Sequence, residues 1–296
     1  MEFQEIDIEV PWGKIAAKLW GNQNDQPVLT VHGLMDNAGS FDSLIPLLPK
    51  CFYICIDLPG HGKSSHLPPF LPIHSDDYMI TYTIVMQHFK KDKFIIMAHS
   101  YGAQIAILYA QIYPEKVEKL IMLDSTYFIT RPVKYFKDDL EYTYDFLLKL
   151  HTKQKKLKPP AYTYEEGVKK IMMQRPFPLT EQAARTLAKR ALVPIEDDKY
   201  TFSIDQRLKA VMNSRNDINY AIKTLKSFPV MCPVLIIFAK DNYMQRYLMQ
   251  SMITFYKRQK NFTMKMIPGN HDVHLDKPEL VAPLVTKFLN EQKSKL

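Results

Sequence analysis

A serine in a turn of small residues is the strongest candidate for chemistry in this sequence. Ser100 lies in the motif Ala98-His-Ser-Tyr-Gly102, which directly follows the apolar run Phe94-Ile-Ile-Met and precedes a segment with helical periodicity. A strand, a sharp turn and a helix in this order form a nucleophile elbow, which holds a serine Oγ above the end of a sheet. The small residues leave room for that strained turn. We therefore predict that Ser100 is a nucleophile; a serine that only caps the following helix is the alternative.

A serine hydroxyl is a weak nucleophile until a neighbouring base removes its proton. The segment Met266-Ile-Pro-Gly-Asn-His-Asp-Val-His274 follows the last predicted strand and contains two histidines. We predict that His271, which lies shortly after Gly269, is the base, because a histidine with a positioned partner accepts a proton near neutral pH. His274 is expected to line the substrate pocket or to pack below it.

The acid that orients the histidine has two candidates. Asp241 follows the apolar strand Val-Leu-Ile-Ile-Phe-Ala and precedes His271 along the chain, with a predicted helix between them. Asp124 also ends a predicted strand and could reach the same histidine from a neighbouring loop. The chain order serine, acid, histidine favours Asp241. We therefore predict a triad of Ser100, Asp241 and His271, with Asp124 as the alternative acid.

Acyl transfer also needs two donors aimed at the oxyanion that develops during the reaction. The motif Val31-His-Gly-Leu-Met35 ends the first predicted parallel strand, and Gly33 would let the backbone pass close to Ser100. We predict that the N–H groups of Leu34 and Tyr101 form the oxyanion hole; an ordinary tight turn after the strand is the alternative. The side chains and backbone expected beside the substrate are those of His32, Gly33, His99 and His274.

Alternating strand and helix patterns must position these residues. Near-continuous apolar strands are typical of a parallel sheet that helices cover on both faces. An antiparallel hairpin over residues 4–20 precedes them. The predicted strands are 28–32, 52–57, 94–99, 119–124, 234–239 and 263–267, and helical periodicity occupies about 40–48, 77–90, 101–113, 243–259 and 278–291.

One long interruption separates two of these strands. Residues 128–228 hold helical patterns broken by prolines, and a structureless loop of that length is improbable in a compact domain. We predict a helical cap at 128–228 over a core domain made of 1–127 and 229–296. The cap holds 20 Lys and Arg against 12 Asp and Glu, so it carries the whole net charge of +8. A basic cap surface would attract anionic substrates.

Composition excludes several other classes. The 296 residues are 46% hydrophobic and 24% charged, as in globular proteins and unlike disordered ones. The N-terminus lacks the pattern of a signal peptide, and no apolar run reaches the roughly 20 residues of a membrane span. The three cysteines, Cys51, Cys55 and Cys232, are not spaced as zinc ligands are, and we expect them to be free thiols in a reducing compartment. The turn at Asp57-Leu-Pro-Gly-His-Gly lacks the spacing of a phosphate loop, so we expect no metal and no cofactor. The basic run at 153–158 has no accompanying nucleic-acid motif.

These motifs together resemble the α/β-hydrolase fold, a mostly parallel eight-stranded sheet with flanking helices and a helical cap inserted between strands 6 and 7. Within that fold, four segments look like the animal serine hydrolase-like proteins of the Kraken type. They are His32-Gly33 with the residues after it, Asp57-Leu-Pro-Gly-His-Gly62, His99-Ser-Tyr-Gly102 and Gly269-Asn-His-Asp-Val-His274. The resemblance implies a triad of Ser100, Asp241 and His271. It also implies a hydrolase of the cytoplasm or the peroxisome.

The expected function is hydrolysis of a carboxylic ester or thioester of a largely apolar substrate, through an acyl-enzyme on Ser100. An apolar substrate is inferred from the cap aromatics Tyr135, Phe136, Tyr142, Tyr144, Phe146, Tyr162 and Tyr164, which could instead form the core of the cap. The alternatives are a noncatalytic protein of the same fold that binds a ligand or partner, and a peroxisomal acyl-CoA thioesterase.

The last residues, Ser294-Lys-Leu296, match the address that the peroxisomal import receptor binds. We therefore expect a peroxisomal protein with this receptor as a partner, and a cytoplasmic location is the alternative.

Overall fold

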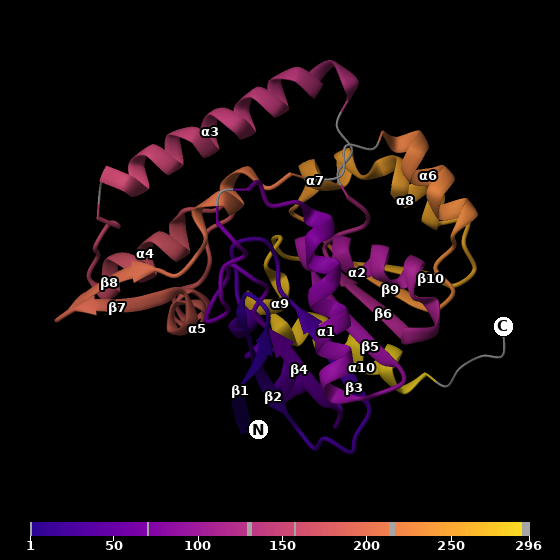
Figure 1. Ribbon diagram of the computed structural model, residues 1–296. Coiled ribbons are helices and arrows are strands. Elements are labelled where there is room, and N and C mark those ends of the chain that lie inside the picture. Colours follow the sequence, from indigo (N-terminus) through magenta and orange to yellow (C-terminus); the bar gives the residue numbers. More distant parts are fainter. Residues whose placement is uncertain (1, 70, 129–131, 157, 213–216, 292–296) are drawn as a thin grey trace.

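The computed structural model describes residues 2–69, 71–128, 132–156, 158–212 and 217–291. Its centre is an eight-stranded sheet with the strand order β1-β2-β4-β3-β5-β6-β9-β10 (Figure 1). The strands are β1 (Phe3–Val10), β2 (Gly13–Trp20), β3 (Pro27–Val31), β4 (Phe52–Ile56), β5 (Phe94–His99), β6 (Val117–Leu123), β9 (Val234–Ala239) and β10 (Phe262–Ile267). The hairpin β1–β2 joins β4 in the antiparallel sense, and the remaining neighbours are parallel. The prediction of a mostly parallel eight-stranded sheet is confirmed.

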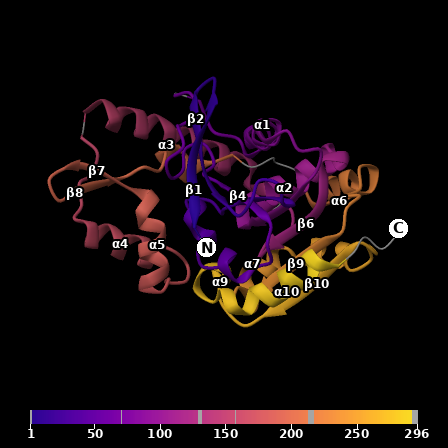
Figure 2. The same cartoon turned by 90° about the horizontal axis from the view of Figure 1, so that it is seen from below.

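Helices cover both faces of the sheet because the inner strands are apolar on both sides. All residues of β3, β4, β5 and β9 are buried. One face packs against α1 (Met79–Phe89), α2 (Ser100–Ile112), α6 (Ile218–Ser227) and α8 (Gln250–Tyr256). The other face packs against α10 (Pro278–Asn290) and the short 3-10 helices η1 (Ala38–Phe41) and η2 (Ile45–Leu47). Figure 2 shows α10 and α1 on opposite sides of the strands.

Two predicted helices differ from the structure. The segment expected as one helix over 40–48 contains only η1 and η2, since Pro46 and Pro49 interrupt a continuous helix there. The Asn37 side chain accepts the Gly39 N–H and begins η1. The helix expected over 243–259 is divided into α7 (Tyr243–Leu248) and α8.

Between β6 and β9 the chain forms a cap and then α6. The buried residues of α6 belong to the same hydrophobic cluster as those of α1, α2 and α8. The cap elements are α3 (Phe136–Lys156), α4 (Tyr164–Met173), α5 (Glu181–Ala191), β7 (Leu192–Glu196), β8 (Lys199–Phe202) and η6 (Gln206–Ala210). The hairpin β7–β8 was not expected in a segment predicted to be helical. Its signal is the pair of short β-type runs around Asp197-Asp198, where Asp198 takes a left-handed φ of 53°.

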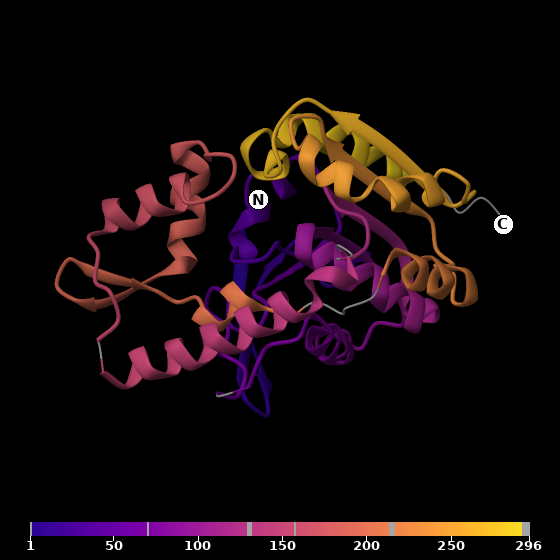
Figure 3. The same ribbon diagram turned by 90° about the horizontal axis from the view of Figure 1, so that it is seen from above.

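Helix α5 fastens the cap to the core. Arg190 binds Asp57 at 2.7 Å and Glu5 at 2.7 Å, and both Arg190 and Asp57 are buried. The Asn37 amide donates to the carbonyl of Leu187 in the same helix, at 3.0 Å. Figure 3 shows α4, α5 and the hairpin as a group beside the core, with α3 running along another edge. The α4–α5 half of the cap therefore has fixed contacts with the core.

Three further sequence observations concern cysteines, membranes and the C-terminal motif. Cys51, Cys55 and Cys232 are free and buried. None of the described helices combines the length and hydropathy that crossing a membrane requires. The motif Ser294-Lys-Leu296 lies outside the described residues.

Candidate active site

Ser100 stands at the junction of β5 and α2 in a strained backbone conformation. Its φ is 47°, in the left-handed region that residues with a side chain rarely adopt. Gly102 lies against the end of β3: a Cβ there would approach the carbonyl oxygens of His32 and Val31 to 2.6 and 2.7 Å. The elbow therefore depends on a glycine where helix and strand meet. Ser100 itself is only half-buried.

His271 joins Ser100 to a carboxylate. Its Nε2 lies 2.8 Å from Ser100 Oγ, and its Nδ1 lies 2.6 Å from Asp124 Oδ2. In the neutral imidazole, Nδ1–H donates to Asp124 and Nε2 accepts the proton of the serine hydroxyl. Burial alone would lower the pKa of His271, but the hydrogen bond and charge of Asp124 outweigh it and raise that pKa above 6.5. The three groups form the hydrogen-bonded chain of a serine nucleophile, its base and an orienting acid.

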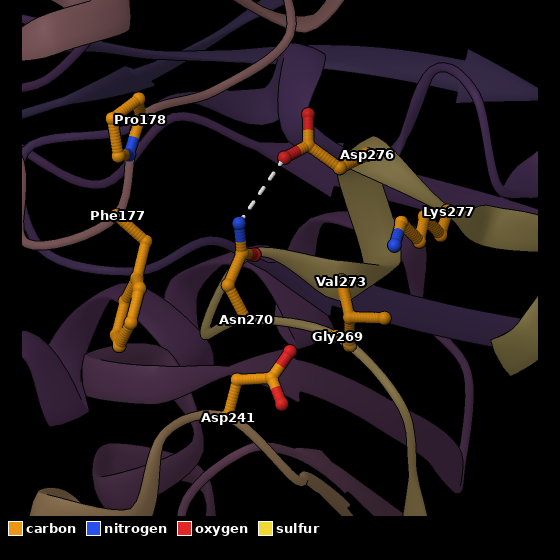
Figure 4. A pocket seen from close by; sticks show the side chains of 8 residues that line it. All are labelled: Phe177, Pro178, Asp241, Gly269, Asn270, Val273, Asp276 and Lys277. Atoms are coloured by element: carbon orange, nitrogen blue, oxygen red, sulfur yellow. Dashed lines mark hydrogen bonds between the residues drawn. The ribbon is translucent and has the colours of Figure 1, made fainter.

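The prediction of Asp241 as the orienting acid is corrected, because the alternative candidate Asp124 contacts His271 and Asp241 does not. Asp241 is exposed, and its backbone N–H binds the Gly269 carbonyl at 2.9 Å. Its side chain points into a neighbouring cavity (Figure 4). Both aspartates follow strands that are adjacent in the sheet and both precede His271, so chain order does not separate them.

Two polar contacts fix the Asp124 carboxylate. Oδ1 accepts the Ala239 N–H at 2.8 Å, and Oδ2 accepts a hydrogen bond from the Asn242 amide at 2.6 Å. The Asn242 nitrogen also lies 3.1 Å from His271 Nδ1, and Asn242 is buried. Asn242 is thus a site residue that sequence reasoning missed. Its only sequence signal is its place directly after the strand end that carries Asp241.

The predicted oxyanion loop passes beside the nucleophile. A Cβ on Gly33 would come within 3.3 Å of Ser100 Cβ and 2.8 Å of His99 Nδ1. Residues 33–36 form a turn in which the Asp36 N–H donates to the Gly33 carbonyl at 3.2 Å, with Met35 at a φ of 66°. Leu34 is therefore an inner residue of a turn next to Ser100. Tyr101 lies in the first turn of α2, where backbone N–H groups have no acceptor within the helix. Their role as oxyanion donors stays a prediction.

Three histidines expected beside the substrate lie instead in the interior. His32 is 0% exposed, His99 1% and His274 0%. His32 Nε2 accepts the Leu58 N–H at 3.0 Å, and Nδ1 donates to the Gly33 carbonyl at 2.7 Å, so His32 joins the loops after β3 and β4. The structure therefore gives His32 and His99 a packing role where substrate contact was expected, and His274 follows the alternative given for it, packing below the site.

His99 and His274 form a buried stack beneath the base. The ring of His99 lies 4.6 Å from that of His271 and 4.1 Å from that of His274, between centroids. Burial lowers the pKa of His99 well below its usual range and that of His274 to about 3, so both rings are neutral. The Nε2–H of His99 donates to the His271 carbonyl at 2.9 Å and so supports the backbone of the base.

A possible metal-ligand set lies next to this stack. Among the described residues, Asp36, His99 and Asp272 offer three buried ligand atoms within 4.8 Å of one another. The guanidinium of Arg175 binds both carboxylates, at 2.8 and 3.0 Å. The chain itself therefore supplies one cation to this cluster, which offsets part of its negative charge.

A cavity of about 240 Å³ opens beside the loop that carries His271 (Figure 4). Its lining combines the cap residues Phe177 and Pro178 with core residues from the loops after β9 and β10. The core residues are Asp241, Gly269, Asn270, Val273, Asp276 and Lys277. The cap and the histidine loop thus share a cavity wall.

Comparisons with known proteins agree with this geometry. Residues 26–278 match the α/β hydrolase fold family. The chain is 32% identical to the serine hydrolase-like protein of Mus musculus, over 96% of this chain and 95% of that protein. It is also 32% identical to a probable serine hydrolase of Drosophila melanogaster, over 98% of this chain and 88% of that protein.

Solved structures show the same fold. The crystal structure of a hypothetical protein from Pseudomonas aeruginosa is 27% identical, has a TM-score of 0.82, and the match covers 97% of this chain and 99% of that chain. A thioesterase domain from the curacin biosynthetic pathway is similar with a TM-score of 0.76 at 19% identity, covering 96% and 99% of the two chains. The resemblance predicted from the four sequence segments is confirmed. This chain belongs to the α/β hydrolase fold family and, within it, to the serine hydrolase-like proteins found across animals.

Proposed function

We propose that this protein is a serine hydrolase that cleaves a carboxylic ester or thioester through an acyl-enzyme on Ser100. The observation that carries the proposal is the continuous chain of contacts from Ser100 Oγ to His271 Nε2, 2.8 Å, and from His271 Nδ1 to Asp124, 2.6 Å. A serine at position 100 also favours acyl transfer over reactions in which a carboxylate at the elbow forms an ester with the substrate.

The proposed reaction has two halves. His271 Nε2 takes the hydroxyl proton while Ser100 Oγ attacks the carbonyl carbon, and Asp124 stabilises the imidazolium that forms. The N–H groups of Leu34 and Tyr101 would donate to the oxyanion of the tetrahedral intermediate. His271 then gives its proton to the departing alkoxide or thiolate. Water then enters, and His271 takes one of its protons as the water oxygen attacks the acyl-enzyme. The second tetrahedral intermediate collapses, His271 returns the proton to Ser100 Oγ, and the carboxylic acid leaves.

The cap supports an apolar substrate in part. Tyr162 and Tyr164 pack against Phe202 and Tyr200 of β8, with ring centroids 5.7 and 5.5 Å apart, so these aromatics belong to the core of the cap. The α3 segment differs, because Phe136, Tyr142 and Tyr144 are 56, 60 and 51% exposed. Exposed aromatic side chains on a cap element offer apolar contacts to a substrate.

A thioester of an anionic carrier, such as an acyl-CoA, is the second candidate substrate. The observation in its favour is charge: the cap segment 128–228 holds 20 basic against 12 acidic residues, whereas the rest of the chain is neutral. A positive surface near a site raises the local concentration of a phosphate-bearing substrate, and the effect weakens with salt. Faster turnover of acyl-CoA than of p-nitrophenyl esters, with a rate that falls as salt is added, would favour this candidate.

Labelling with a fluorophosphonate tests the proposal directly. The wild-type protein should react at Ser100 and should hydrolyse a short p-nitrophenyl ester, and Ser100→Ala should do neither. The matched control is Ser125→Ala, a buried serine on the strand end that carries Asp124. Absence of labelling in the folded wild type would refute the proposal and would favour a noncatalytic protein that binds a ligand or partner.

We also propose import into peroxisomes through Ser294-Lys-Leu296. The sequence motif alone supports this part of the proposal.

A further inference from the structure

One cap residue contacts both loops that build the active site. Arg175 lies between α4 and α5, and its guanidinium binds Asp36 Oδ1 through Nη2 at 2.8 Å and Asp272 Oδ2 through Nη1 at 3.0 Å. The two carboxylates come from separate parts of the core. Asp36 follows β3, and Asp272 follows β10. A single planar group thus joins the cap to two distant core segments.

Each carboxylate lies next to a residue of the proposed catalytic site. Asp36 closes the turn of residues 33–36, whose inner residue Leu34 carries a predicted oxyanion donor. Asp272 is the residue directly after the base, His271, and it begins the short helix α9 (Val273–Asp276). A shift of either carboxylate would therefore move a backbone segment that carries one of the reacting groups.

The charged groups of this contact are largely buried, so each needs its partner to offset the cost of losing water. The side chains of Asp36 and Asp272 are 4 and 7% exposed, and that of Arg175 is 17% exposed. Burial raises the pKa of Asp272, and the nearby guanidinium opposes that rise. Removing the guanidinium would leave two buried carboxylates close to each other without their cation, a strongly unfavourable arrangement that is relieved by protonation of one carboxylate or by separation of the two loops.

The neighbouring cap residues strengthen the same link. The backbone N–H and the hydroxyl of Thr180 donate to Asp276 Oδ1 at 3.1 and 2.9 Å. Leu275 packs into the hydrophobic cluster of α4 and α5. The cap segment 175–180 therefore holds the histidine loop along its length, and Arg175 is the part of it that also reaches the oxyanion turn.

We propose that Arg175 is a positioning residue, which holds the Leu34 turn and the His271 loop at their catalytic separation and so makes an active triad depend on the docked cap. The inference rests on the proposed function, because it assigns Arg175 to the same reaction. An arginine suits this role, since its planar fork presents separate N–H groups to two acceptors, whereas a lysine ammonium is a point charge.

The competing explanation is that Arg175 only attaches the cap. Arg190 provides the comparison, because it is also a cap arginine that binds a buried carboxylate of the core. Its partners are Asp57 and Glu5, and it makes no ion pair with Asp36 or Asp272. Arg185 provides the neutral control. It pairs with Glu165 and Glu181 of the cap and is 39% exposed.

The experiment measures fluorophosphonate labelling rate, kcat, KM and Tm for Arg175→Met, Arg175→Lys, Arg190→Met and Arg185→Met. Arg175→Met should lose about 10- to 100-fold in kcat and in labelling rate with KM changed by less than about threefold, because misplacement by about 1 Å costs that much. Arg175→Lys should recover part of the loss. Arg190→Met should lower Tm more than kcat, and Arg185→Met should match the wild type.

Two outcomes would overturn the inference while leaving the proposed function intact. One is labelling of Arg175→Met within about twofold of a wild type that does label. The other is equal loss of kcat in Arg175→Met and Arg190→Met, which would mean that cap attachment alone matters. If Arg175→Met fails to fold, Arg175→Lys decides the question, because wild-type kcat in that variant would contradict a need for the two-acceptor fork. Failure of the wild type to label would instead refute the proposed function.

Discussion

Asp124 Oδ2 lies 2.6 Å from Nδ1 of His271, although 147 residues separate the two along the chain. The contact exists because β6, β9 and β10 are consecutive parallel strands, so the loops that follow all three lie at the same edge of the sheet. It makes Asp124 the acid of the proposed triad and leaves Asp241 outside it.

Asp124→Asn should lower kcat by roughly 10³- to 10⁴-fold, because an amide at this position no longer holds the imidazole in the tautomer that accepts the serine proton. The matched control is Asp241→Asn, which alters the exposed aspartate on the adjacent strand end. Its kcat should stay within about twofold of the wild type. Steady-state hydrolysis of a p-nitrophenyl ester measures both. Equal losses in the two variants would contradict the assignment of Asp124.

The activity should fall in acid with a midpoint above 6.5. The carboxylate of Asp124 raises the pKa of His271 against the opposing effect of burial. A raised pKa means that the imidazole keeps its proton to higher pH, and a protonated imidazole cannot act as the base. The pH profile of kcat/KM reports this ionisation in the free protein. A midpoint well below 6.5 would show that Asp124 does not govern the base in solution.

Gly102→Ala should destabilise the fold by about 2 kcal/mol, because the new methyl group would meet two backbone carbonyl oxygens that cannot move independently of β3. Gly167→Ala is the control, since Gly167 is also in a helix and the atoms nearest to its Cβ would be those of the flexible Leu192 side chain, the first at 2.6 Å. It should be destabilised less, helped by the better helix propensity of alanine. Urea denaturation gives the free energy of unfolding of each variant. Equal values for Gly102→Ala and Gly167→Ala would argue against a close approach of α2 to the end of β3.

A reporter protein that ends in residues 285–296 of this chain should accumulate in peroxisomes of animal cells, because the import receptor reads Ser-Lys-Leu at a free C-terminus. Fluorescence microscopy with a peroxisomal marker provides the measurement. The same reporter without Leu296 should be diffuse. A diffuse signal from the intact tail would contradict the proposed location.

Much of the fold follows from local sequence. The inner strands are short apolar runs closed by turn residues, and burial on both faces is their only stable environment, so their positions agree closely with the structure. The elbow is also local, because Ala98, Ser100 and Gly102 satisfy the steric needs of one turn. His271 is recognisable for a related reason: it comes just after the last strand, at the sheet edge where Ser100 stands.

Other features of the structure could not be predicted from local sequence. The cap hairpin β7–β8 was hidden within a segment of helical composition, since two short strands form a stable pair only where neighbouring elements cover them. His32 and His99 were expected at the substrate, and His274 either at the substrate or packed below it, because the sequence does not say which side of a loop is buried. The ion pair between Arg175 and Asp36 joins residues 139 apart, and no local pattern marks either one.

The sequence by itself determined which residue types form the candidate site and where they lie along the chain. These are a serine in an elbow, a histidine after the last strand, and an acid at a strand end between the two. Only the tertiary structure decided which acid. Asp124 and Asp241 both end parallel strands and both precede His271, so their local sequences are equivalent for this purpose. The choice depends on side-chain direction at the end of each strand, where Asp124 turns toward the imidazole with its carboxylate held by Ala239 and Asn242, and Asp241 turns out into the cavity. Such directions arise from packing between strands, which no single segment of the chain encodes.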